Sequence, residues 1–388
     1  MSNPIITSLL DTDLYKYTMQ QLMVLRYPTA QARMAFRCRS GQLDIAVEEL
    51  QEQIEWLGEL RLSEDELNWL ASLPYIEQKF VDWLSDFRLK PESVSVREQN
   101  GELAIEVTGN WAEITHFEIF LLAIVSESQC RSQSEQESET VGMARLQSKI
   151  DFLKANLAAD GEGFRLVDFG TRRRFSREWQ QTVVETLQLQ IPEYFVGTSN
   201  LSVAMKTGLT PVGTMAHEWL QAHQALSDQL HSSQKDALTV WLKEYAGQLG
   251  VALTDTISMK AFLRDFDTTL AEAYVGIRHD SGDPIEWGEQ ALMHYQQLGI
   301  DASHKQFVFS DKLDFKRALQ IHQHFSGRAQ TSFGIGTYLT NDMGFPAPNI
   351  VLKLVEVNDK PVAKLSDNPD KVMCQDERYV QTLRKLFG

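Results

Sequence analysis

Apolar and polar positions follow two different rhythms along this chain of 388 residues, and the change falls near residue 163. Between residues 45 and 60, apolar side chains recur every three or four positions, which predicts an amphipathic helix. Ser63 followed by Glu66 has the pattern of a capping box and predicts the start of another helix. Apolar and polar residues alternate between residues 93 and 108, and this alternation predicts a half-exposed hairpin.

The remaining N-terminal elements have weaker patterns. Thr12 and Asp13 are both good helix caps, so a helix is expected to begin there. Residues 34–38 read as a strand, and two long helices are expected between residues 111 and 157. This combination of helices and strands predicts a smaller α+β domain. No group of residues typical of a catalytic site is evident in it.

After residue 163, short apolar runs alternate with stretches of the length that a crossover helix needs. The runs are residues 164–167, 194–196, 211–212, 251–253, 274–277, 306–309, 332–335 and 350–352. This pattern of about eight strands favours a parallel sheet closed into a barrel, or otherwise a doubly wound sheet. We divide the chain into an N-terminal α+β domain (1–125), a helical connection (126–162), an α/β barrel with the active site (163–356) and a C-terminal segment (357–388).

Composition narrows the class of protein. Acidic residues outnumber basic ones, 53 to 37, and the net charge is −16, which disfavours nucleic acid and anionic membranes as partners. Three cysteines without a paired motif favour a reducing cytoplasm over a disulfide framework. No apolar run approaches the length of a membrane span, and the N-terminus lacks a signal-peptide pattern.

Polar residues gather where the predicted strands end, and this is where α/β barrels carry their active sites. Each motif alone has an ordinary structural explanation, but their joint occurrence favours a site for an anionic ligand. Arg172 and Arg278 offer forked donors to a carboxylate or phosphate. The other candidates are Gly334, Gly336 and Thr337 for phosphate, Asp255, Asp280 and Asp311 for ribose hydroxyls or a divalent cation, and Phe169 with Tyr15 for a flat ring.

His217 is expected in the first turn of a helix that follows a strand. Unpaired N–H groups and the helix dipole favour an anion there, so His217 can carry a proton or attack a phosphoryl group. A capping histidine is the ordinary alternative. The chain has neither a dinucleotide-binding nor a P-loop glycine pattern, and its histidine spacing does not suggest zinc.

These stretches together resemble the nicotinate phosphoribosyltransferase family. The matching segments run in family order: 9–16, 168–173, 197–200, 213–218, 276–284 and 333–337. The resemblance implies an irregular α/β barrel of the type II phosphoribosyltransferase kind, with a smaller domain built mainly from the N-terminus. It also implies condensation of nicotinate with phosphoribosyl pyrophosphate, coupled to ATP hydrolysis through a phosphohistidine.

The resemblance assigns roles to particular residues. His217 matches the phosphorylated histidine, Tyr15, Thr214 and Arg278 match nicotinate-binding positions, and Thr337 matches a phosphoribosyl-binding position. Mg²⁺ and a carboxylate such as Asp280 would stabilise the departing pyrophosphate and the oxocarbenium-like sugar. The residues around Asp311 depart from the family pattern, so its role stays open.

Three alternatives stay open. A nicotinamide-using relative of the same fold is disfavoured by Ser199, because an Asp there would accept from an amide and repel a carboxylate. A non-catalytic nucleotide-binding barrel would not need His217. The third alternative is a barrel that carries only solvated charges, which would not need polar motifs at the ends of so many predicted strands. Small molecules are the expected partners of a cytoplasmic monomer or homodimer, and Tyr15 is expected to act in its own or a neighbouring subunit.

Overall fold

The computed structural model describes residues 3–41, 43–99, 101–131, 135–157, 163–245, 247–367, 372, 374 and 376–388. The chain divides into two compact units, each assembled from separated stretches. The first contains residues 1–161, 167–213 and 335–353, and the second contains 162–166, 214–334 and 354–388.

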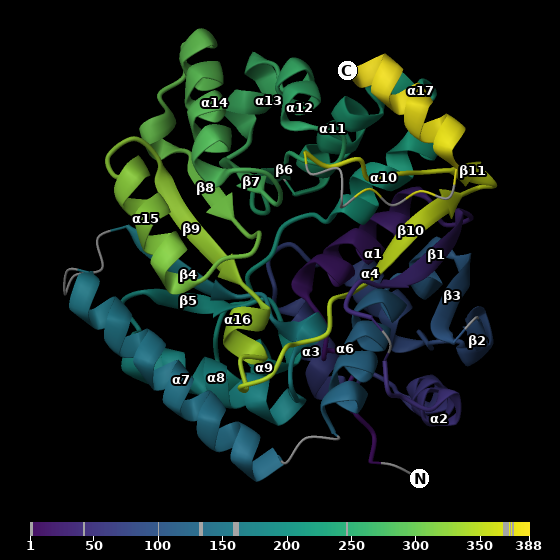
Figure 1. Cartoon of the computed structure of the whole chain (residues 1–388). Helices are drawn as coiled ribbons and strands as arrows, with labels where there is room; N and C mark the ends of the chain where they lie inside the picture. Colours follow the sequence, from purple (N-terminus) through teal and green to yellow (C-terminus); the bar gives the residue numbers. More distant parts are fainter. Residues whose placement is uncertain are drawn as a thin grey trace. The chain divides into compact units, whose positions relative to one another are not determined.

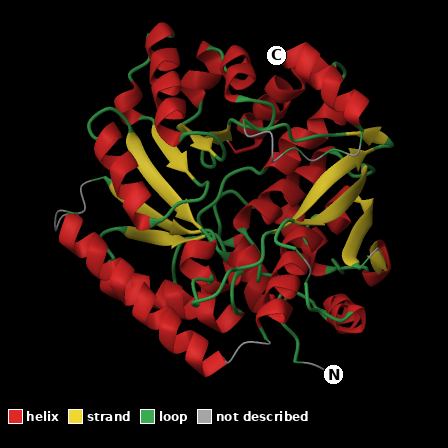
Figure 2. Ribbon diagram, viewed as in Figure 1, coloured by secondary structure: helices red, strands yellow, loops and turns green. Residues whose placement is uncertain are grey.

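The first unit is rich in helices, which Figures 1 and 2 show beside an antiparallel group of strands. Its helices are α1 (Leu14–Arg26), α2 (Val47–Glu59), α3 (Glu64–Ala71), α4 (Gln78–Ser85), α5 (Trp111–Ile114), α6 (Phe117–Cys130), α7 (Glu135–Asn156), α8 (Arg177–Gln190), α9 (Leu201–Thr207) and α16 (Thr337–Thr340), with 3-10 turns η1 (Pro91–Ser93) and η2 (Thr171–Arg173). Asp13 is the N-cap residue of α1, and Ser63 with Glu66 forms a complete capping box at α3. Both predicted helix starts are therefore confirmed.

The antiparallel strands of this unit are β1 (Gln31–Cys38), β2 (Val94–Gln99) and β3 (Glu102–Asn110). β3 pairs with β1 on one side and β2 on the other, with Met34 opposite Val107 and Val96 opposite Ile105. The predicted hairpin and the predicted strand at 34–38 are both present. The unit also contains β5 (Phe195–Thr198), which lies next to the end of β4 (Phe164–Asp168).

The second unit contains a parallel set of strands in the order β4, β9, β8, β7, β6. Its strands are β6 (Val251–Leu253), β7 (Gly276–His279), β8 (Gln306–Phe309) and β9 (Gln330–Ile335), with β11 (Lys360–Pro361) apart from them. Its helices are α10 (His217–Leu226), α11 (Ser233–Tyr245), α12 (Met259–Asp265), α13 (Thr268–Ala273), α14 (Pro284–Gln297), α15 (Phe315–Phe325) and α17 (Glu377–Phe387), with 3-10 turns η3 (Leu230–Ser232) and η4 (Ala302–His304). The predicted α/β class with a parallel sheet is confirmed, whereas these pairings do not establish closure into a barrel.

An aromatic layer joins the parallel strands to the helices α14 and α15, which run beside them in Figure 1. The ring of Trp287 in α14 lies 5.3 Å from the rings of both Phe307 and Phe309 in β8. A Cβ atom added to Gly288 would lie 2.2 Å from the Phe325 ring of α15, so only glycine allows the two helices to approach this closely. Buried aromatic area of this kind stabilises the unit and fixes the strand ends that carry the site.

One predicted strand is absent, and another is present but lies outside the parallel set. Residues 211–212 form no strand: Pro211 has no N–H to donate, and Val212 N makes a single bond to Thr198 O at 2.9 Å. Residues 350–352 belong to β10 (Ile350–Val357), which pairs antiparallel with β11 and is not a member of the parallel set. Asn358 and Asp359 both have positive φ, as a two-residue hairpin turn requires, and this turn directs the chain back along β10.

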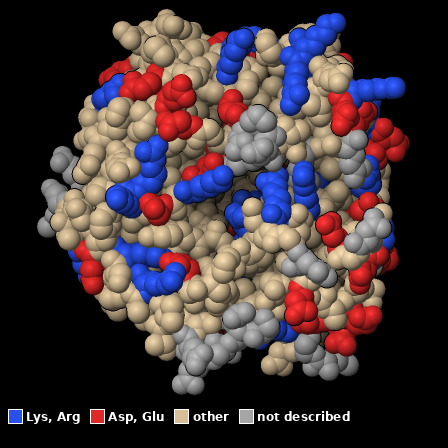
Figure 3. Space-filling model, viewed as in Figure 1, with Lys and Arg blue, Asp and Glu red and all other residues tan. Residues whose placement is uncertain are grey.

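Charges of both signs are distributed over the surface. In Figure 3, Lys and Arg side chains lie among Asp and Glu side chains on the face that is drawn. The net charge of −16 is therefore compatible with local groups of basic residues. Among the described residues, no helix has both the length and the apolar character that crossing a membrane requires.

Candidate active site

His217 is the first residue of α10, so its predicted place in the first turn of a helix is confirmed, and its side chain is buried. The preceding residue, Ala216, has extended backbone geometry and no capping side chain. The first turn of a helix carries N–H groups without partners in the helix, together with the positive end of the helix dipole. His217 therefore lies where negative charge is favoured.

Two carboxylates and one ammonium group surround the His217 side chain. His217 Nε2 lies 2.8 Å from Asp255 Oδ1 and 3.6 Å from Asp280 Oδ2. Lys364 Nζ lies 2.9 Å from Asp255 Oδ2 and 3.5 Å from Asp280 Oδ2. Ser281 Oγ donates to Asp255 Oδ2 at 2.6 Å. We call these five residues the His217 cluster, and all of them lie in the second unit.

The cluster keeps His217 neutral. Burial and the nearby Lys364 ammonium lower the pKa of His217 to about 4, although Asp255 and Asp280 oppose this. Burial opposes ionisation of Asp255 as well, but Lys364 and His217 outweigh it and hold the pKa of that carboxyl well below its usual range. Burial also opposes the ionisation of Asp280, but Lys364, His217 and Arg278 together outweigh it and lower the pKa of that carboxyl. At neutral pH the imidazole thus faces two carboxylates as a neutral donor and acceptor.

The same residues have some features of a metal site. One donor atom each from His217, Asp255 and Asp280 lies within 4.8 Å of the others. However, both carboxylates already form ion pairs with Lys364, and Asp255 is also hydrogen-bonded to His217. Mg²⁺ requires near-octahedral oxygen ligands and would compete with an ammonium group here. The residues of this cluster therefore do not fit a Mg²⁺ ion held by the protein alone.

The other predicted residues of the second unit lie in its parallel strands, directly after them, or in contact with them. Arg278 is buried in β7, and its charge acts on Asp280. Asp311 follows β8 and acts electrostatically on His279, while Ser310 Oγ donates to Asp280 Oδ1 at 3.1 Å. Thr214 is buried and its hydroxyl donates to Val251 O. Gly334 lies within β9.

In the first unit, Ser199 is joined to the N-terminal segment. Its hydroxyl donates to Asp13 Oδ1 at 2.8 Å, and Leu14 N donates to Ser199 O at 2.8 Å. Asp13 is itself buried, and burial raises its pKa although Ser199 and Arg172 oppose the shift. Ser199 thus lies beside a carboxyl group that the sequence analysis did not assign.

Arg172 belongs to a group of three basic residues around Glu118. Lys16 Nζ lies 2.7 Å from Glu118 Oε2, and Lys353 Nζ lies 3.0 Å from Oε1. Arg172 Nη1 is 3.7 Å from Oε1. Burial opposes the ionisation of Glu118, but these cations outweigh it and lower its pKa. Three cations share one carboxylate, so positive charge exceeds negative charge in this group, and the predicted binding of an anion by Arg172 stays a prediction.

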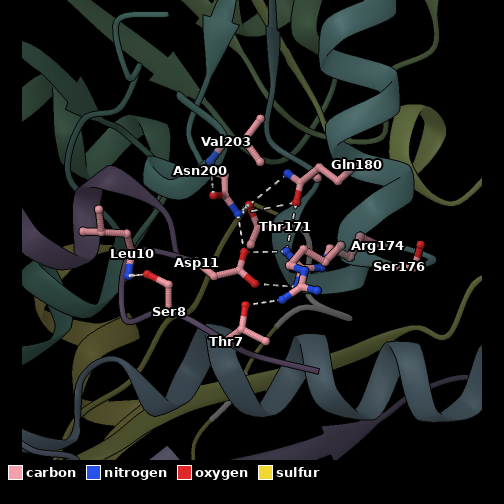
Figure 4. Close-up of polar contacts among 12 residues, drawn as sticks. Thr7, Ser8, Leu10, Asp11, Thr171, Arg174, Ser176, Gln180, Asn200 and Val203 are labelled. Carbon is pink, nitrogen blue, oxygen red and sulfur yellow. Dashed lines mark hydrogen bonds and ion pairs between the residues drawn. The ribbon is translucent and has the colours of Figure 1, made fainter. Parts of the chain in front are cut away.

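A buried network, shown in Figure 4, fixes the loops that carry Phe169, Arg172 and Ser199. Arg174 is fully buried and donates two hydrogen bonds to Asp11, from Nη1 to Oδ1 at 2.6 Å and from Nη2 to Oδ2 at 2.8 Å. Its Nε donates to Glu127 at 2.7 Å. Asn200 Nδ2 donates to Asp11 Oδ1 at 2.8 Å, which ties the start of α9 to the same carboxylate.

The other predicted residues of the first unit are Phe169, Gly336, Thr337 and Tyr15. Phe169 N donates to Ile335 O at 2.9 Å, directly after β4. A Cβ atom on Gly336 would lie 3.1 Å from Phe169 O, so glycine allows this close approach of two backbones. Thr337 begins α16, and Tyr15 is the second residue of α1. Stacking of a flat ring between Tyr15 and Phe169 stays a prediction.

Sequence reasoning missed Lys364 and the partners Lys16, Glu118 and Lys353. Only Lys364 left a usable signal, because it interrupts the apolar run formed by residues 361–365. A lysine in such a run is expected to be buried and therefore paired. The remaining three look like ordinary charges on helices or strands, and only the fold brings them together.

Two carboxylates that follow parallel strands, beside a buried histidine and a buried lysine, give this α/β protein a group of side chains suited to catalysis. Comparison with known proteins defines the family. Residues 164–388 match the nicotinate phosphoribosyltransferase (NAPRTase) family, and residues 10–126 match its N-terminal domain. The chain belongs to the nicotinate phosphoribosyltransferase family and is an enzyme of this type.

Relatives cover the full length of the chain. Nicotinate phosphoribosyltransferases from Escherichia coli O9:H4 (strain HS) and Shigella boydii serotype 4 (strain Sb227) are each 50% identical over 389 aligned positions, which cover 100% of this chain and 97% of theirs. The crystal structure of the Vibrio cholerae nicotinate phosphoribosyltransferase has a TM-score of 0.94 at 40% identity and covers 100% of this chain and 94% of that one. The Porphyromonas gingivalis structure has a TM-score of 0.91 at 34% identity, covering 98% and 100%.

Proposed function

We propose that this enzyme condenses nicotinate with phosphoribosyl pyrophosphate, and that His217 couples the reaction to ATP hydrolysis as a phosphohistidine. The products of the transfer are nicotinate mononucleotide, a precursor of NAD, and pyrophosphate. The observation that carries the proposal is the 2.8 Å contact between His217 Nε2 and Asp255 Oδ1 at the N-terminus of α10.

The contact indicates which ring nitrogen attacks. Asp255 is ionised and can only accept, so Nε2 carries the proton and Nδ1 keeps its lone pair. Nδ1 attacks the γ-phosphorus of ATP, the bond from phosphorus to the bridging oxygen breaks, and ADP leaves with the electron pair. The ring becomes a phosphorylated imidazolium, and the Asp255 and Asp280 carboxylates stabilise its positive charge.

The transfer step needs a nucleophile, a leaving group and charge neutralisation. The ring nitrogen of nicotinate attacks C1 of the sugar, and the bond from C1 to the pyrophosphate oxygen breaks. Arg278 offers a fork to the nicotinate carboxylate, while Ser199 and Thr214 are proposed to bind the same substrate. Arg172, Gly334, Gly336 and Thr337 are proposed for the phosphates, and Asp280 and Asp311 for the sugar.

Mg²⁺ is proposed to enter with the phosphates of the substrates, because Mg²⁺ commonly keeps substrate phosphates and water as ligands. It would neutralise charge on the departing pyrophosphate. Hydrolysis of the phosphohistidine then returns His217 to its starting state. Coupling requires that the phosphorylated enzyme binds phosphoribosyl pyrophosphate more tightly than the free enzyme does.

The deciding experiment compares wild type with His217→Asn, using γ-labelled ATP, Mg²⁺ and both substrates. Wild type should carry acid-labile, alkali-stable label, and ATP should stimulate formation of nicotinate mononucleotide. His217→Asn should lose both the label and the stimulation, while slow transfer without ATP continues because the site still orients the substrates. His231→Asn, which changes an exposed histidine, should behave as wild type.

Label that persists in His217→Asn would assign the carrier role to another residue. Offering nicotinamide in place of nicotinate tests the substrate, and equal product from both would contradict the choice of acid over amide. We further propose a cytoplasmic enzyme, supported by three free cysteines. As a monomer or homodimer, it would use Tyr15 from the same or a neighbouring subunit to stack on the substrate ring.

A further inference from the structure

The proposed reaction does not yet use Lys364, which is the cation of the His217 cluster. Its side chain is only 7% exposed, and it lies in the C-terminal stretch of the second unit, three residues after the end of β11. Removing an ammonium group from water is costly unless it is paired. Its position is therefore expected to serve the groups that it contacts.

Those groups are the two carboxylates that face His217. Lys364 Nζ lies 2.9 Å from Asp255 Oδ2 and 3.5 Å from Asp280 Oδ2, so one cation bridges two anions. The other oxygen of Asp255, Oδ1, faces His217 Nε2 at 2.8 Å. The lysine thus fixes the rotation of the Asp255 carboxylate, with one oxygen held by the ammonium group and the other directed at the imidazole.

We propose that Lys364 is a positioning residue for His217, which holds Asp255 and Asp280 together and directs them at the imidazole. This inference rests on the proposed phosphoryl-carrier function and adds a residue to it. Lys364 touches neither the phosphoryl group nor the substrates in this proposal, and acts only through the two carboxylates.

The chain around Lys364 is fixed at almost every residue. Leu365 N donates to Thr256 O at 2.9 Å, and Ser366 Oγ lies 3.5 Å from Asp255 Oδ2. Ser366 adopts a left-handed backbone with φ of 65°, a conformation that is costly for a residue other than glycine. Both carboxylate oxygens of Asp367 accept from Met259 N at 3.0 Å. Strain held by bonds on both sides is typical of a segment that must present one side chain accurately.

Charge balance gives this position a chemical consequence. Two carboxylates without a cation would favour imidazolium at His217, and imidazolium has no lone pair for attack on phosphorus. They would also repel each other. With Lys364 between them, both stay ionised and His217 stays neutral.

The other charged groups nearby act mainly on the carboxylates or on Lys364. Arg278 acts on Asp280, His279 interacts with both carboxylates and with Asp311, and Asp367 interacts with Asp255 and Lys364. The groups that act directly on His217 are Lys364, Asp255 and Asp280. Lys364 is the cation among these three, so replacing it should raise the pKa of His217.

The first test follows the titration of His217 by nitrogen NMR in the full chain labelled with ¹⁵N-histidine, with the resonance assigned through His217→Asn. Wild-type His217 should stay neutral down to about pH 5, well below the ordinary histidine midpoint of about 6.5. Lys364→Met should raise the midpoint by about one pH unit or more, and Lys364→Arg should restore it. Lys360→Met removes an exposed lysine of β11 as the matched control and should leave the midpoint unchanged.

An unchanged midpoint in folded Lys364→Met would overturn the inference, and so would a wild-type midpoint at or above about 6.5. If Lys364→Met does not fold, Lys364→Gln removes the charge while keeping a donor and should show the same upward shift. The absence of that shift in folded Lys364→Gln would equally overturn the inference.

The second test measures the rate of histidine phosphorylation against pH. Between the His217 midpoints of the two proteins, Lys364→Met should be slower than wild type, by roughly tenfold for each unit by which the pH lies below the midpoint of the variant. The two rates should converge above that midpoint. Equal pH profiles would contradict the inference. A wild type that titrates as expected but carries no acid-labile phosphate would overturn the carrier function and leave the positioning role intact.

Discussion

Ser199 Oγ donates a hydrogen bond of 2.8 Å to Asp13 Oδ1, and both groups are buried. The bond joins the residue after β5 to the N-cap of α1, so the position that was predicted to choose between acid and amide substrates already has a carboxyl neighbour. A second carboxylate at position 199 would therefore meet Asp13 as well as any substrate carboxylate.

Ser199→Asp should weaken nicotinate binding, with KM rising about tenfold or more, because two buried carboxylates in contact cannot both stay ionised without cost. Ser199→Asn is the matched control, since it changes the size similarly but adds no charge. Its KM should rise less. The measurement is steady-state kinetics with nicotinate varied, and equal KM values for the two variants would show that charge at position 199 does not reach the substrate.

Arg278→Lys should lower kcat/KM for nicotinate roughly five- to 150-fold, which corresponds to a loss of about 1–3 kcal/mol of transition-state stabilisation. A lysine supplies a point charge and cannot make the two parallel bonds of a guanidinium fork. Arg278 is buried in β7, where its direction is fixed by the sheet.

Arg264→Lys, on the exposed side of α12, is the control for the loss of a guanidinium group. The measurement is kcat/KM for nicotinate at saturating phosphoribosyl pyrophosphate, compared between the two variants and wild type. If kcat/KM for Arg278→Lys matches that of the control, the carboxylate binds elsewhere, with Arg172 the next candidate.

Local pattern predicted the elements well and the site in part. The capping box at Ser63 and the strand at 306–309 could be found because the signal lies within a few residues. Asp255 and Asp280 could be found because each follows the end of a parallel strand, and His217 because it begins a helix.

Lys364 could not be assigned in this way, because its partners precede it by about 80 to 110 residues and only the fold brings them together. For a related reason, residues 211–212 were wrongly assigned to a strand, and the strand at 350–352 was wrongly assigned to the parallel sheet. A short apolar run reports burial, but strand pairing depends on neighbours that the run does not contain.

Arg174→Met should destabilise the protein by about 3–5 kcal/mol, since it leaves the Asp11 and Glu127 carboxyls buried without their cation. Burial already raises the pKa of Glu127 to about 7 with Arg174 present. Arg165→Met, at an exposed position of β4, is the control and should change stability little. Urea unfolding followed by circular dichroism measures the difference. A loss below about 1 kcal/mol would mean that the network contributes little to stability.

His223 provides a test of pH dependence away from the reacting groups. It is buried in α10, its Nδ1 lies 2.8 Å from Trp219 O, and burial lowers its pKa to about 4. The unfolded chain should titrate near 6.5, so it binds more protons than the folded chain between these values. The stabilising contribution is therefore complete above about pH 6.5 and is lost as the pH falls toward about 4.

His223→Gln keeps a donor for Trp219 O but cannot titrate. Between about pH 6.5 and pH 4, the free energy of unfolding of the wild type should fall more steeply than that of the variant, by up to about 1.4 kcal/mol per pH unit. The buried residues His116 and His217 contribute slopes of the same sign, but they are present in both proteins and cancel in the difference. His231→Gln, at an exposed position, should follow the wild type. Urea unfolding at several pH values gives the slopes, and parallel curves for wild type and His223→Gln would show that His223 is not held neutral in the folded chain.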